Sequence, residues 1–498
     1  MVLGTTSGAG KSWICTALCR WYARQGLRVA PFKAQNMSNN ARVVSGGEIG
    51  SAQYFQALAA GVEPSVQMNP VLLKPEADTR SQVILLGEVN DALGAMPWRE
   101  RHHHTWPVIS AALDALRATH DVVVIEGAGS PAEINLHSTD VVNLRVARHA
   151  DAACLLVSDI DRGGAFAHLY GTWALMPEAD RRLLRGFVLN RFRGDASLLA
   201  PAPEIIEEKT GVPVVATVPM WRGHGLPEED GWFQYRDRQA PRGGEVPAPV
   251  SVGPEGHRAT RRRGRRIFLI APPRISNLDE FEPLSGLEGV ELIAVRGAGM
   301  LPAPDDWIIL PGSKHTSSDL AWLKRQGLDT WVVDHAMRGG PVLGICGGLQ
   351  MLGKQLHDPH GVDGTAEGLG LLPLETVFEP EKVLQRRSLH FGAVPGVWQA
   401  ASGVAVSGYE IHQGQTKALT GKGPAVAVLP DGLGWCNAAG NVLGIYLHGI
   451  FENDALLRAL LGRSARPLPA VFDGLADHVE ASFRPGVLMG LLRPACQG

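Results

Sequence analysis

A loop near the start of the chain has residue types that can bind phosphate groups. It reads Gly4-Thr5-Thr6-Ser7-Gly8-Ala9-Gly10-Lys11-Ser12 and lies between a short apolar run and a segment, 13–25, with a helical pattern. In such a loop, glycines let backbone N–H groups converge on phosphates, a lysine neutralises their charge, and a hydroxyl helps to hold Mg²⁺. The candidate ATP contacts are Thr6, Gly8, Gly10, Lys11 and Ser12. The alternative is a Gly-rich turn that only precedes a helix.

A second candidate centre surrounds Cys346. The segment Gly344-Ile345-Cys346-Gly347-Gly348 follows an apolar run and precedes a helical pattern, which is the arrangement of a nucleophile elbow with sulfur as the nucleophile. A thiol with an ordinary pKa of about 8.5 needs a base or a helix N-terminus to activate it at neutral pH. His448, at the end of a later apolar run, is the candidate base. Backbone N–H groups of Gly347 and of the turn Gly312-Ser313 are candidates for stabilising an oxyanion.

Further apolar runs end in polar residues. The run Val122–Ile125 ends in Glu126, and the run 186–189 ends in Asn190. Because ligands of open parallel sheets collect at the carboxyl ends of the strands, these side chains are candidates for one ligand site. We predict that Glu126 joins Ser12 in holding a metal ion and that Asn190 contacts the nucleotide.

Length and composition indicate two or three packed α/β units. Hydrophobic residues make up 45% of the chain and charged residues 19%, which suits a turn-rich α/β enzyme better than a disordered or coiled-coil protein. The net charge of −3 predicts no nucleic-acid or membrane partner, and no apolar run reaches the roughly 18 residues needed to cross a bilayer. Six scattered cysteines favour a reducing cytoplasm. His102, His103 and His104 are interpreted as a surface cluster, because adjacent histidines cannot share one helix face.

The order of the segments predicts the domain organisation. Repeated strand-then-helix units predict a doubly wound sheet over residues 1–238, although three residues before the first loop are few for a strand and leave an earlier native start open. Residues 239–266, rich in Pro, Gly and Arg, are interpreted as a linker rather than a nucleic-acid patch, because they contain no interleaved aromatic residues. A second α/β domain is predicted over 267–462, and 463–498 is assigned to a C-terminal tail.

These motifs resemble those of the glutamine-hydrolysing cobyric acid synthases, a family of cobalamin biosynthesis. The resemblance covers nearly the whole chain in order, and the first loop, one residue longer than the usual P-loop, is similar to that of dethiobiotin synthetase. The segments that carry the resemblance are Gly4–Ser12, Phe32–Asn40, Glu126–Leu136, Asp159–Gly164, Asn190–Asp195, Leu310–Lys314 and Gly408–Gly414.

The resemblance implies an α/β fold in two parts: an N-terminal dethiobiotin-synthetase-like P-loop domain and a C-terminal class I glutamine amidotransferase domain. It implies amidation of carboxylates b, d, e and g of adenosylcobyrinic acid a,c-diamide, or of the hydrogenobyrinic equivalent, with ATP, Mg²⁺ and glutamine. The corrinoid is then a substrate, and no tightly bound organic cofactor is expected. The glutamine or oxyanion candidates are Gly312, Ser313, Gly347 and Gln350. The corrinoid candidates, chosen for a wide and flat ligand in an open cleft, are Lys33, Gln35, Asn36, Glu133, Asn135 and Asp161.

A carboxylate anion is a poor electrophile, so our hypothesis is that ATP phosphorylates it and that ammonia from glutamine displaces the phosphate. In class I amidotransferases a Glu commonly lies two residues after the catalytic His; that position is Ile450 here, and Glu452 lies four beyond. We therefore predict only the dyad Cys346 and His448. CTP synthase, the a,c-diamide synthase and a MinD-like ATPase switch remain alternatives, and a homo-oligomer remains open.

Overall fold

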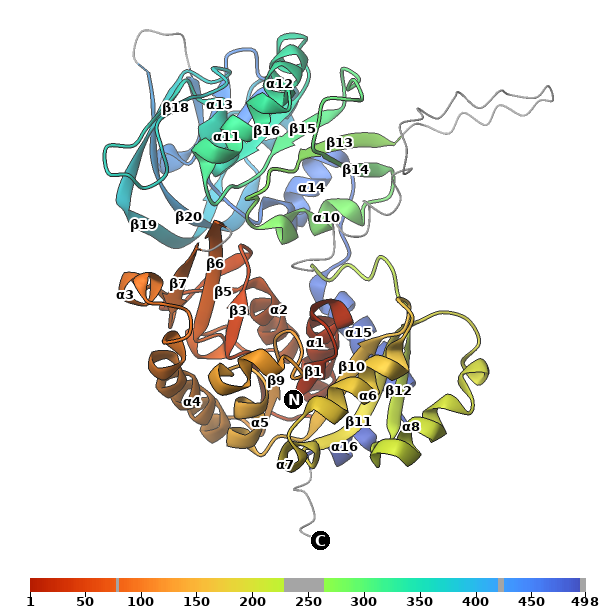
Figure 1. Ribbon diagram of the computed structural model, residues 1–498. Coiled ribbons are helices and arrows are strands. Elements are labelled where there is room, and N and C mark those ends of the chain that lie inside the picture. Colours follow the sequence, from red (N-terminus) through yellow and green to blue (C-terminus); the bar gives the residue numbers. More distant parts are fainter. Residues whose placement is uncertain (78–79, 228–263, 420–424, 493–498) are drawn as a thin grey trace, which may run out of the picture.

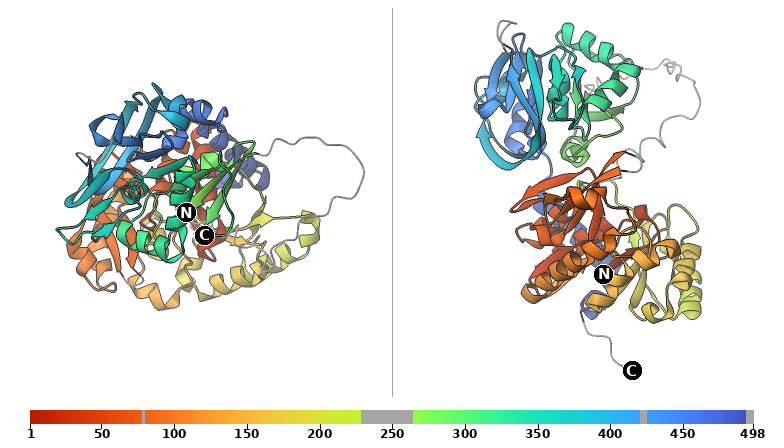
Figure 2. Two further views of the ribbon diagram at one scale, coloured as in Figure 1. Left: turned by 90° about the horizontal axis from the view of Figure 1, so that it is seen from above. Right: turned by 60° about the vertical axis from the view of Figure 1, so that its left-hand side comes forward.

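The computed structural model describes residues 1–77, 80–227, 264–419 and 425–492. They form two α/β lobes, with the first half of the chain in one and most of the second half in the other (Figures 1 and 2). Most of the predicted linker lies outside the described residues. The first strand of the second lobe begins at Arg265, so its first two residues fall inside the predicted linker, which ends at residue 266.

The first lobe is built on a parallel sheet, as the repeated strand-then-helix units predicted. Its strand order is β2 (Val29–Phe32), β9 (Val122–Ile125), β1 (Val2–Gly4), β10 (Cys154–Asp159), β11 (Leu184–Phe192) and β12 (Val214–Pro219). A bridge between Val2 and Glu126 joins β9 to β1. Because later strands lie on both sides of β1, the carboxyl edge beside β1 is the point where ligands of such sheets bind.

Helices cover both faces of this sheet. They include α1 (Lys11–Arg24), α2 (Ser51–Ala60), α4 (Arg101–Thr119), α5 (Leu144–Ala150), α6 (Ala165–Leu175) and α8 (Ala202–Thr210). A smaller sheet and a hairpin rise from this lobe toward the second one (Figure 1). The sheet has the order β3 (Gln35–Met37), β6 (Val71–Ala77), β7 (Arg80–Leu85) and β8 (Glu88–Val89), and the hairpin pairs β4 (Ala41–Val44) with β5 (Gly47–Gly50).

The second lobe contains the other predicted sheet. Its order is β14 (Val290–Val295), β13 (Arg265–Ile270), β15 (Trp307–Leu310), β16 (Val342–Ile345), β23 (Val442–Ile445), β22 (Gly434–Asn437) and β21 (Ala425–Leu429). A second sheet contains the long hairpin of β19 (Leu374–His390) and β20 (Ala405–Ala418). Since β16 and β23 are parallel neighbours, the residues that follow them meet at one edge.

The C-terminal segment returns to the first lobe. Helices α15 (Leu468–Ser482) and α16 (Val487–Gly490) pack beside α1, on the lobe that also holds the N-terminus (Figure 1). Arg20 pairs with Asp473 at 2.7 Å, and the Tyr22 hydroxyl donates to the Leu488 carbonyl at 2.7 Å. The segment for which the sequence predicted no role therefore completes the core behind the phosphate loop.

This packing gives a stability prediction. Leu475 on α15 is fully buried in the same cluster as residues of α1, so Leu475→Ala is expected to lower the free energy of unfolding by about 2–5 kcal/mol. Glu480→Ala, on the exposed face of the same helix, is the matched control and should change it by less than about 0.5 kcal/mol. Urea unfolding of both variants measures the difference, and equal values would show that α15 adds nothing to this core.

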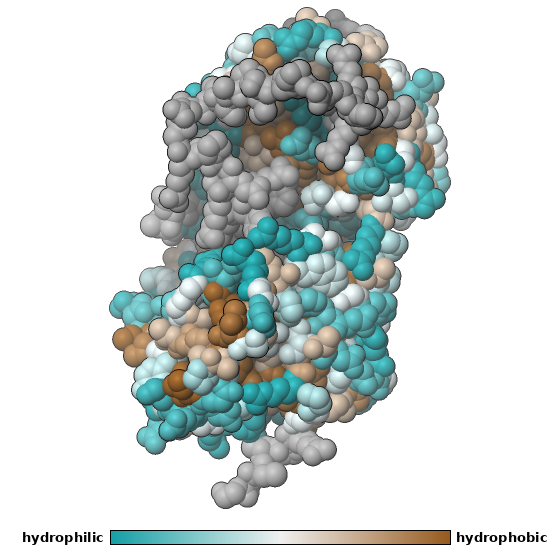
Figure 3. All heavy atoms as spheres, turned by 90° about the vertical axis from the view of Figure 1, so that its right-hand side faces the viewer, coloured by the Kyte–Doolittle hydropathy of each residue, from teal (hydrophilic) through white to brown (hydrophobic). Residues whose placement is uncertain are grey.

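Within the described residues, every helix is too short or too polar to cross a bilayer. Figure 3 shows hydrophilic and hydrophobic residues interspersed on one face of the molecule. His103 and His104 are exposed on α4, and in the described part of the chain no cluster of three His, Cys, Asp or Glu residues could hold a metal ion. The exposure of His103 and His104 agrees with the interpretation of this run as a surface cluster, whereas His102 is half-buried.

Candidate functional site

The loop before α1 has the backbone geometry of a phosphate-binding loop. Gly10 has a φ of 92°, and a Cβ there would lie 2.2 Å from Nδ2 of Asn190, so only glycine fits. Lys11 Nζ donates to the carbonyls of Thr6 at 3.0 Å and of Gly129 at 3.1 Å. Asn190 Nδ2 donates to the Ala9 carbonyl at 2.9 Å. The structure thus brings the predicted residues of β1, α1 and β11 to one place.

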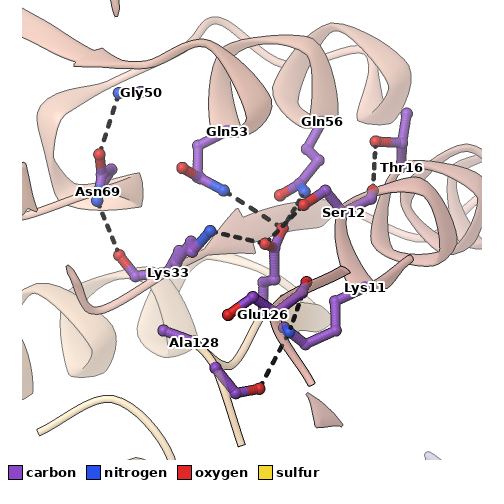
Figure 4. A network of polar contacts seen from close by, with 12 residues as sticks. Lys11, Ser12, Thr16, Lys33, Gly50, Gln53, Gln56, Asn69, Glu126 and Ala128 are labelled. Carbon is purple, nitrogen blue, oxygen red and sulfur yellow. Dashed lines mark hydrogen bonds and ion pairs between the residues drawn. The ribbon is translucent and has the colours of Figure 1, made fainter. Parts of the chain in front are cut away.

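Glu126 lies at the centre of a buried polar network (Figure 4). Its Oε1 accepts from Ser12 Oγ and from Lys33 Nζ, both at 2.8 Å, and its Oε2 accepts from Gln56 Nε2 at 2.6 Å and Gln53 Nε2 at 3.4 Å. Burial alone would raise the pKa of Glu126, but the Lys33 ammonium and these hydrogen bonds hold it below its usual value. The carboxylate is therefore charged at neutral pH.

The donors at this point suit Mg²⁺. A carboxylate and a hydroxyl, Glu126 and Ser12, converge beside the phosphate loop at 2.8 Å from each other. Mg²⁺ commonly takes one or two protein oxygens and completes its shell with water and substrate phosphates. The two residues predicted for the metal therefore fit it.

The thiol lies on a sharp turn between β16 and α13 (Gly347–Leu352). Cys346 has a φ of 51°, a conformation that costs a non-glycine residue about 1–3 kcal/mol and often marks a functional site. A Cβ on Gly348 would lie 2.0 Å from the Leu310 carbonyl oxygen, so the helix can approach β15 only with glycine there. The predicted elbow is confirmed as a strand, a strained cysteine and a helix.

His448 follows β23 and is oriented by a carboxylate. Its Nδ1 donates to Oε1 of Glu280 at 2.9 Å, and Oε2 of Glu280 accepts from the Gly449 amide at 2.9 Å. Burial alone would lower the pKa of His448, but the charge of Glu280 and the nearby Cys346 raise it to about 10. The Nε2 atom is buried and, in the described part of the chain, has no hydrogen-bond partner of standard geometry. Glu280 is therefore hydrogen-bonded to His448, and Cys346 lies near enough to the imidazole to affect its charge.

Glu280 was missed by the sequence analysis. It lies in the turn η5 (Leu278–Phe281) near the start of the second lobe, 168 residues before the histidine, and is fully buried. Glu452, the nearest acidic residue after His448, instead binds Arg42 at 2.6 Å. Only the adjacent acidic residues at 279 and 280 could have drawn attention to this turn, and this pattern does not indicate that one of them contacts His448.

The oxyanion candidates surround the same site. A Cβ on Gly347 would lie 2.8 Å from the Ser313 amide nitrogen, and a Cβ on Gly312 would lie 2.8 Å from Cε1 of His448. Gln350 is buried, accepts from Thr316 at 2.9 Å and donates to the Tyr446 hydroxyl at 3.2 Å. The turn 312–313 thus lies beside Gly347 and His448, while the roles of these residues in binding glutamine stay predictions.

The corrinoid candidates are more dispersed. Lys33 and Asn36 are buried, and Lys33 belongs to the Glu126 network. Glu133 and Asn135 are exposed at η3 (Ile134–Thr139), whereas Asp161 pairs with Arg193 beyond β10. Gln35 is half-buried on β3. Their part in corrinoid binding stays a prediction.

The Glu280 contact gives a prediction about pH. Glu280→Gln keeps the shape but removes the charge that raises the pKa of His448, so the imidazolium should be lost at lower pH. We expect kcat for glutamine hydrolysis to fall by about 10² and the alkaline limb of its pH profile to move from near 10 toward the ordinary histidine range. Glu288→Gln, on an exposed residue, is the control. An unchanged alkaline limb would mean that Glu280 does not set the charge of His448.

Comparison with known proteins finds a matching domain family for each half of the chain. Residues 1–222 match the CobQ/CobB/MinD/ParA nucleotide binding domain, and residues 266–456 match the CobB/CobQ-like glutamine amidotransferase domain. Relatives named cobyric acid synthase include those of Variovorax paradoxus (64% identity), Polaromonas sp. (63%) and Polaromonas naphthalenivorans (62%). Each alignment covers 99% of this chain and at least 98% of the relative.

Proposed function

Since this chain belongs to the cobyric acid synthase family, we propose that it converts adenosylcobyrinic acid a,c-diamide to adenosylcobyric acid by amidating carboxylates b, d, e and g. The hydrogenobyrinic equivalent is the alternative substrate. One observation carries the proposal: a single chain joins a phosphate loop, with a buried carboxylate beside it, to a cysteine on a sharp turn near a histidine that is hydrogen-bonded to a buried glutamate. The first centre prepares an acid and the second releases nitrogen.

The second lobe releases ammonia from glutamine. The Cys346 sulfur attacks the side-chain carbonyl carbon, and His448 gives its proton to the nitrogen that leaves as ammonia. Water then hydrolyses the glutamyl thioester to glutamate and frees the thiol. Glu280 keeps the ring in one orientation and stabilises its positive charge, as the carboxylate of a catalytic triad does.

The first lobe activates the acceptor. A carboxylate oxygen of the corrinoid attacks the γ-phosphorus of ATP, so ADP leaves and an acyl phosphate forms. Ammonia then attacks the acyl carbon, and phosphate leaves as the amide forms. Lys11 and the backbone amides of the loop balance the phosphate charge. Ser12 and Glu126 would hold Mg²⁺, which would supply further positive charge at the phosphates.

The interface between the lobes supports a direct transfer of ammonia. Lys314, next to the turn 312–313, contacts Oε1 of Gln82 at 3.1 Å and Oε1 of Glu76 at 3.5 Å in the first lobe. The glutaminase turn therefore rests on the sheet β6–β7. Ammonia that crosses at this interface avoids protonation in bulk water, and the acyl phosphate is protected from hydrolysis.

The surface around η3 supports the corrinoid placement. Ile134 and Leu136 are 61% and 42% exposed there, and they alternate along the chain with the polar candidates Glu133 and Asn135. Gly129, which precedes this segment, accepts from Lys11, so the surface adjoins the phosphate loop. Exposed apolar side chains with polar neighbours suit a flat ring that carries carboxylates and amides at its rim.

Measuring which substrates the enzyme turns over tests the assignment. The enzyme should form four amides from the a,c-diamide in the presence of ATP and glutamine, as measured by mass spectrometry. Turnover of UTP, or of cobyrinic acid lacking the a and c amides, would favour CTP synthase or the a,c-diamide synthase. ATP hydrolysis without any amide product would favour a nucleotide switch. A cytoplasmic location is part of the proposal, because glutamine and ATP are supplied there.

A further inference from the structure

We propose that Arg42, a residue of the nucleotide-binding lobe, positions the glutaminase group of the other lobe, so that this site is complete only when the two lobes are docked. The inference rests on glutamine hydrolysis at Cys346 and not on the identity of the acceptor. Arg42 touches none of the reacting atoms of that mechanism and acts through its neighbours.

Residues 40–42 of the first lobe hold the turn that carries Glu280. The Leu278 amide donates to Oδ1 of Asn40 at 2.8 Å, and the Ala41 amide donates to Oδ1 of Asn277 at 3.0 Å. Arg42 donates through Nε to Oδ2 of Asp279 at 3.1 Å and makes a second, shorter bond to the same oxygen. Contacts from the other lobe therefore reach each of the three residues that precede Glu280.

Arg42 also contacts two residues that neighbour His448, which are Tyr409 and Glu452. Its guanidinium lies 5.1 Å from the ring centroid of Tyr409, and this ring stacks on His448 at 5.4 Å with an angle of 19° between the planes. Its NH1 atom donates to Glu452 at 2.6 Å, in the turn after His448. One arginine thus contacts a neighbour of Glu280, the ring against His448 and the turn that follows it.

The arginine is suited to this role by burial and charge. It is 2% exposed, and two carboxylates compensate its charge inside the interface. A planar guanidinium makes several hydrogen bonds in fixed directions, which a lysine ammonium cannot reproduce. Removing it would leave the buried Asp279 carboxylate without its partner and free the turn to move.

Helix α2 connects this contact to the ATP site. Phe55 and Tyr54 on α2 lie 4.9 and 5.6 Å from the guanidinium, while Gln53 and Gln56 on the same helix donate to Glu126. The amide of Ser51, the first residue of α2, donates to the Asn40 carbonyl at 3.1 Å. The helix that contacts the nucleotide-site carboxylate therefore also supports the residues that hold the glutaminase turn.

The test compares two reactions of full-length variants. Arg42→Met should lower kcat for glutamine hydrolysis at least about tenfold, because small displacements of catalytic groups have effects of this size, with KM for glutamine within about twofold. Synthesis driven by ammonium chloride should stay within about twofold of wild type. Arg42→Lys should restore part of the lost kcat. Asn40→Ala removes one contact to the turn. It should also lower kcat for glutamine hydrolysis, but by less than Arg42→Met does.

Arg386→Met is the matched control. Arg386 also crosses the interface, donating to the Val43 carbonyl at 2.9 Å and pairing with Glu63, but it contacts no residue of the turn. It should leave both reactions unchanged. If Arg42→Met is too unstable to purify, Arg42→Lys and Asn40→Ala decide the question. Unchanged glutaminase kcat in these variants, or an equal loss of glutamine-driven and ammonia-driven synthesis, would overturn the proposal.

Discussion

Replacing Cys346 by alanine is expected to abolish glutamine-driven amidation while synthesis from added ammonium salt continues. In the proposed mechanism the thiol is the nucleophile, so the residual rate without it should be lower by at least about 10³-fold. The ATP site lies in the other lobe and keeps its contacts among Ser12, Lys33 and Glu126. Amide formation from each nitrogen source is measured separately by liquid chromatography of the corrinoid products.

Cys436→Ala is the matched control for this prediction. Cys436 is buried on β22 in the same lobe, outside the elbow, so its loss should leave glutamine-driven synthesis near the wild-type rate. Loss of the ammonia-driven reaction in Cys346→Ala would show that the two lobes do not house separate reactions. Persistence of the glutamine-driven reaction would remove the thiol from the mechanism.

Lys11→Ala is expected to impair amidation from both nitrogen sources while glutamine hydrolysis continues. Without the ammonium group, the charge that builds on the transferring phosphoryl is not balanced, so amidation should fall by about 10³-fold with either nitrogen source. Glutamine hydrolysis should persist, because Glu280 still holds His448 in the other lobe. Rates of ADP, glutamate and amide formation distinguish these effects.

Lys209→Ala provides the comparison for Lys11. Lys209 is exposed on α8 of the same lobe and should be neutral in all three rates. If Lys11→Ala forms amides at the wild-type rate, the loop does not bind the transferred phosphate. Together, Cys346→Ala and Lys11→Ala divide the overall reaction into a nitrogen-releasing half and an acid-activating half.

The sheets and the two reactive centres could be predicted because their signals are local. The apolar run Val122–Ile125 became a central parallel strand with Glu126 at its end, and the glycines around Cys346 indicated a turn that larger side chains would obstruct. Parallel strands then brought distant segments to one edge, which is why His448 lies at the same sheet edge as the thiol.

The remaining site features depend on contacts between distant segments. Glu280 meets His448 across 168 residues, and Arg42 meets Asp279 across 237. Neither pairing leaves a periodic or motif signal, since any acidic residue in a turn would have the same local pattern. The packing of α15 on the first lobe could not be predicted either, because the apolar face of this helix indicates that it is buried but not which segment it packs against.

The most direct test of the account follows the nitrogen atom through the wild-type enzyme. Glutamine labelled with ¹⁵N in its side-chain amide is supplied with ATP and the corrinoid a,c-diamide, together with an excess of unlabelled ammonium salt at neutral pH. If Cys346 releases ammonia that passes to an acid activated beside Lys11, mass spectrometry will find the new amides of the product mainly labelled. Product amides without ¹⁵N would contradict the account, because the two centres would then not act on the same nitrogen.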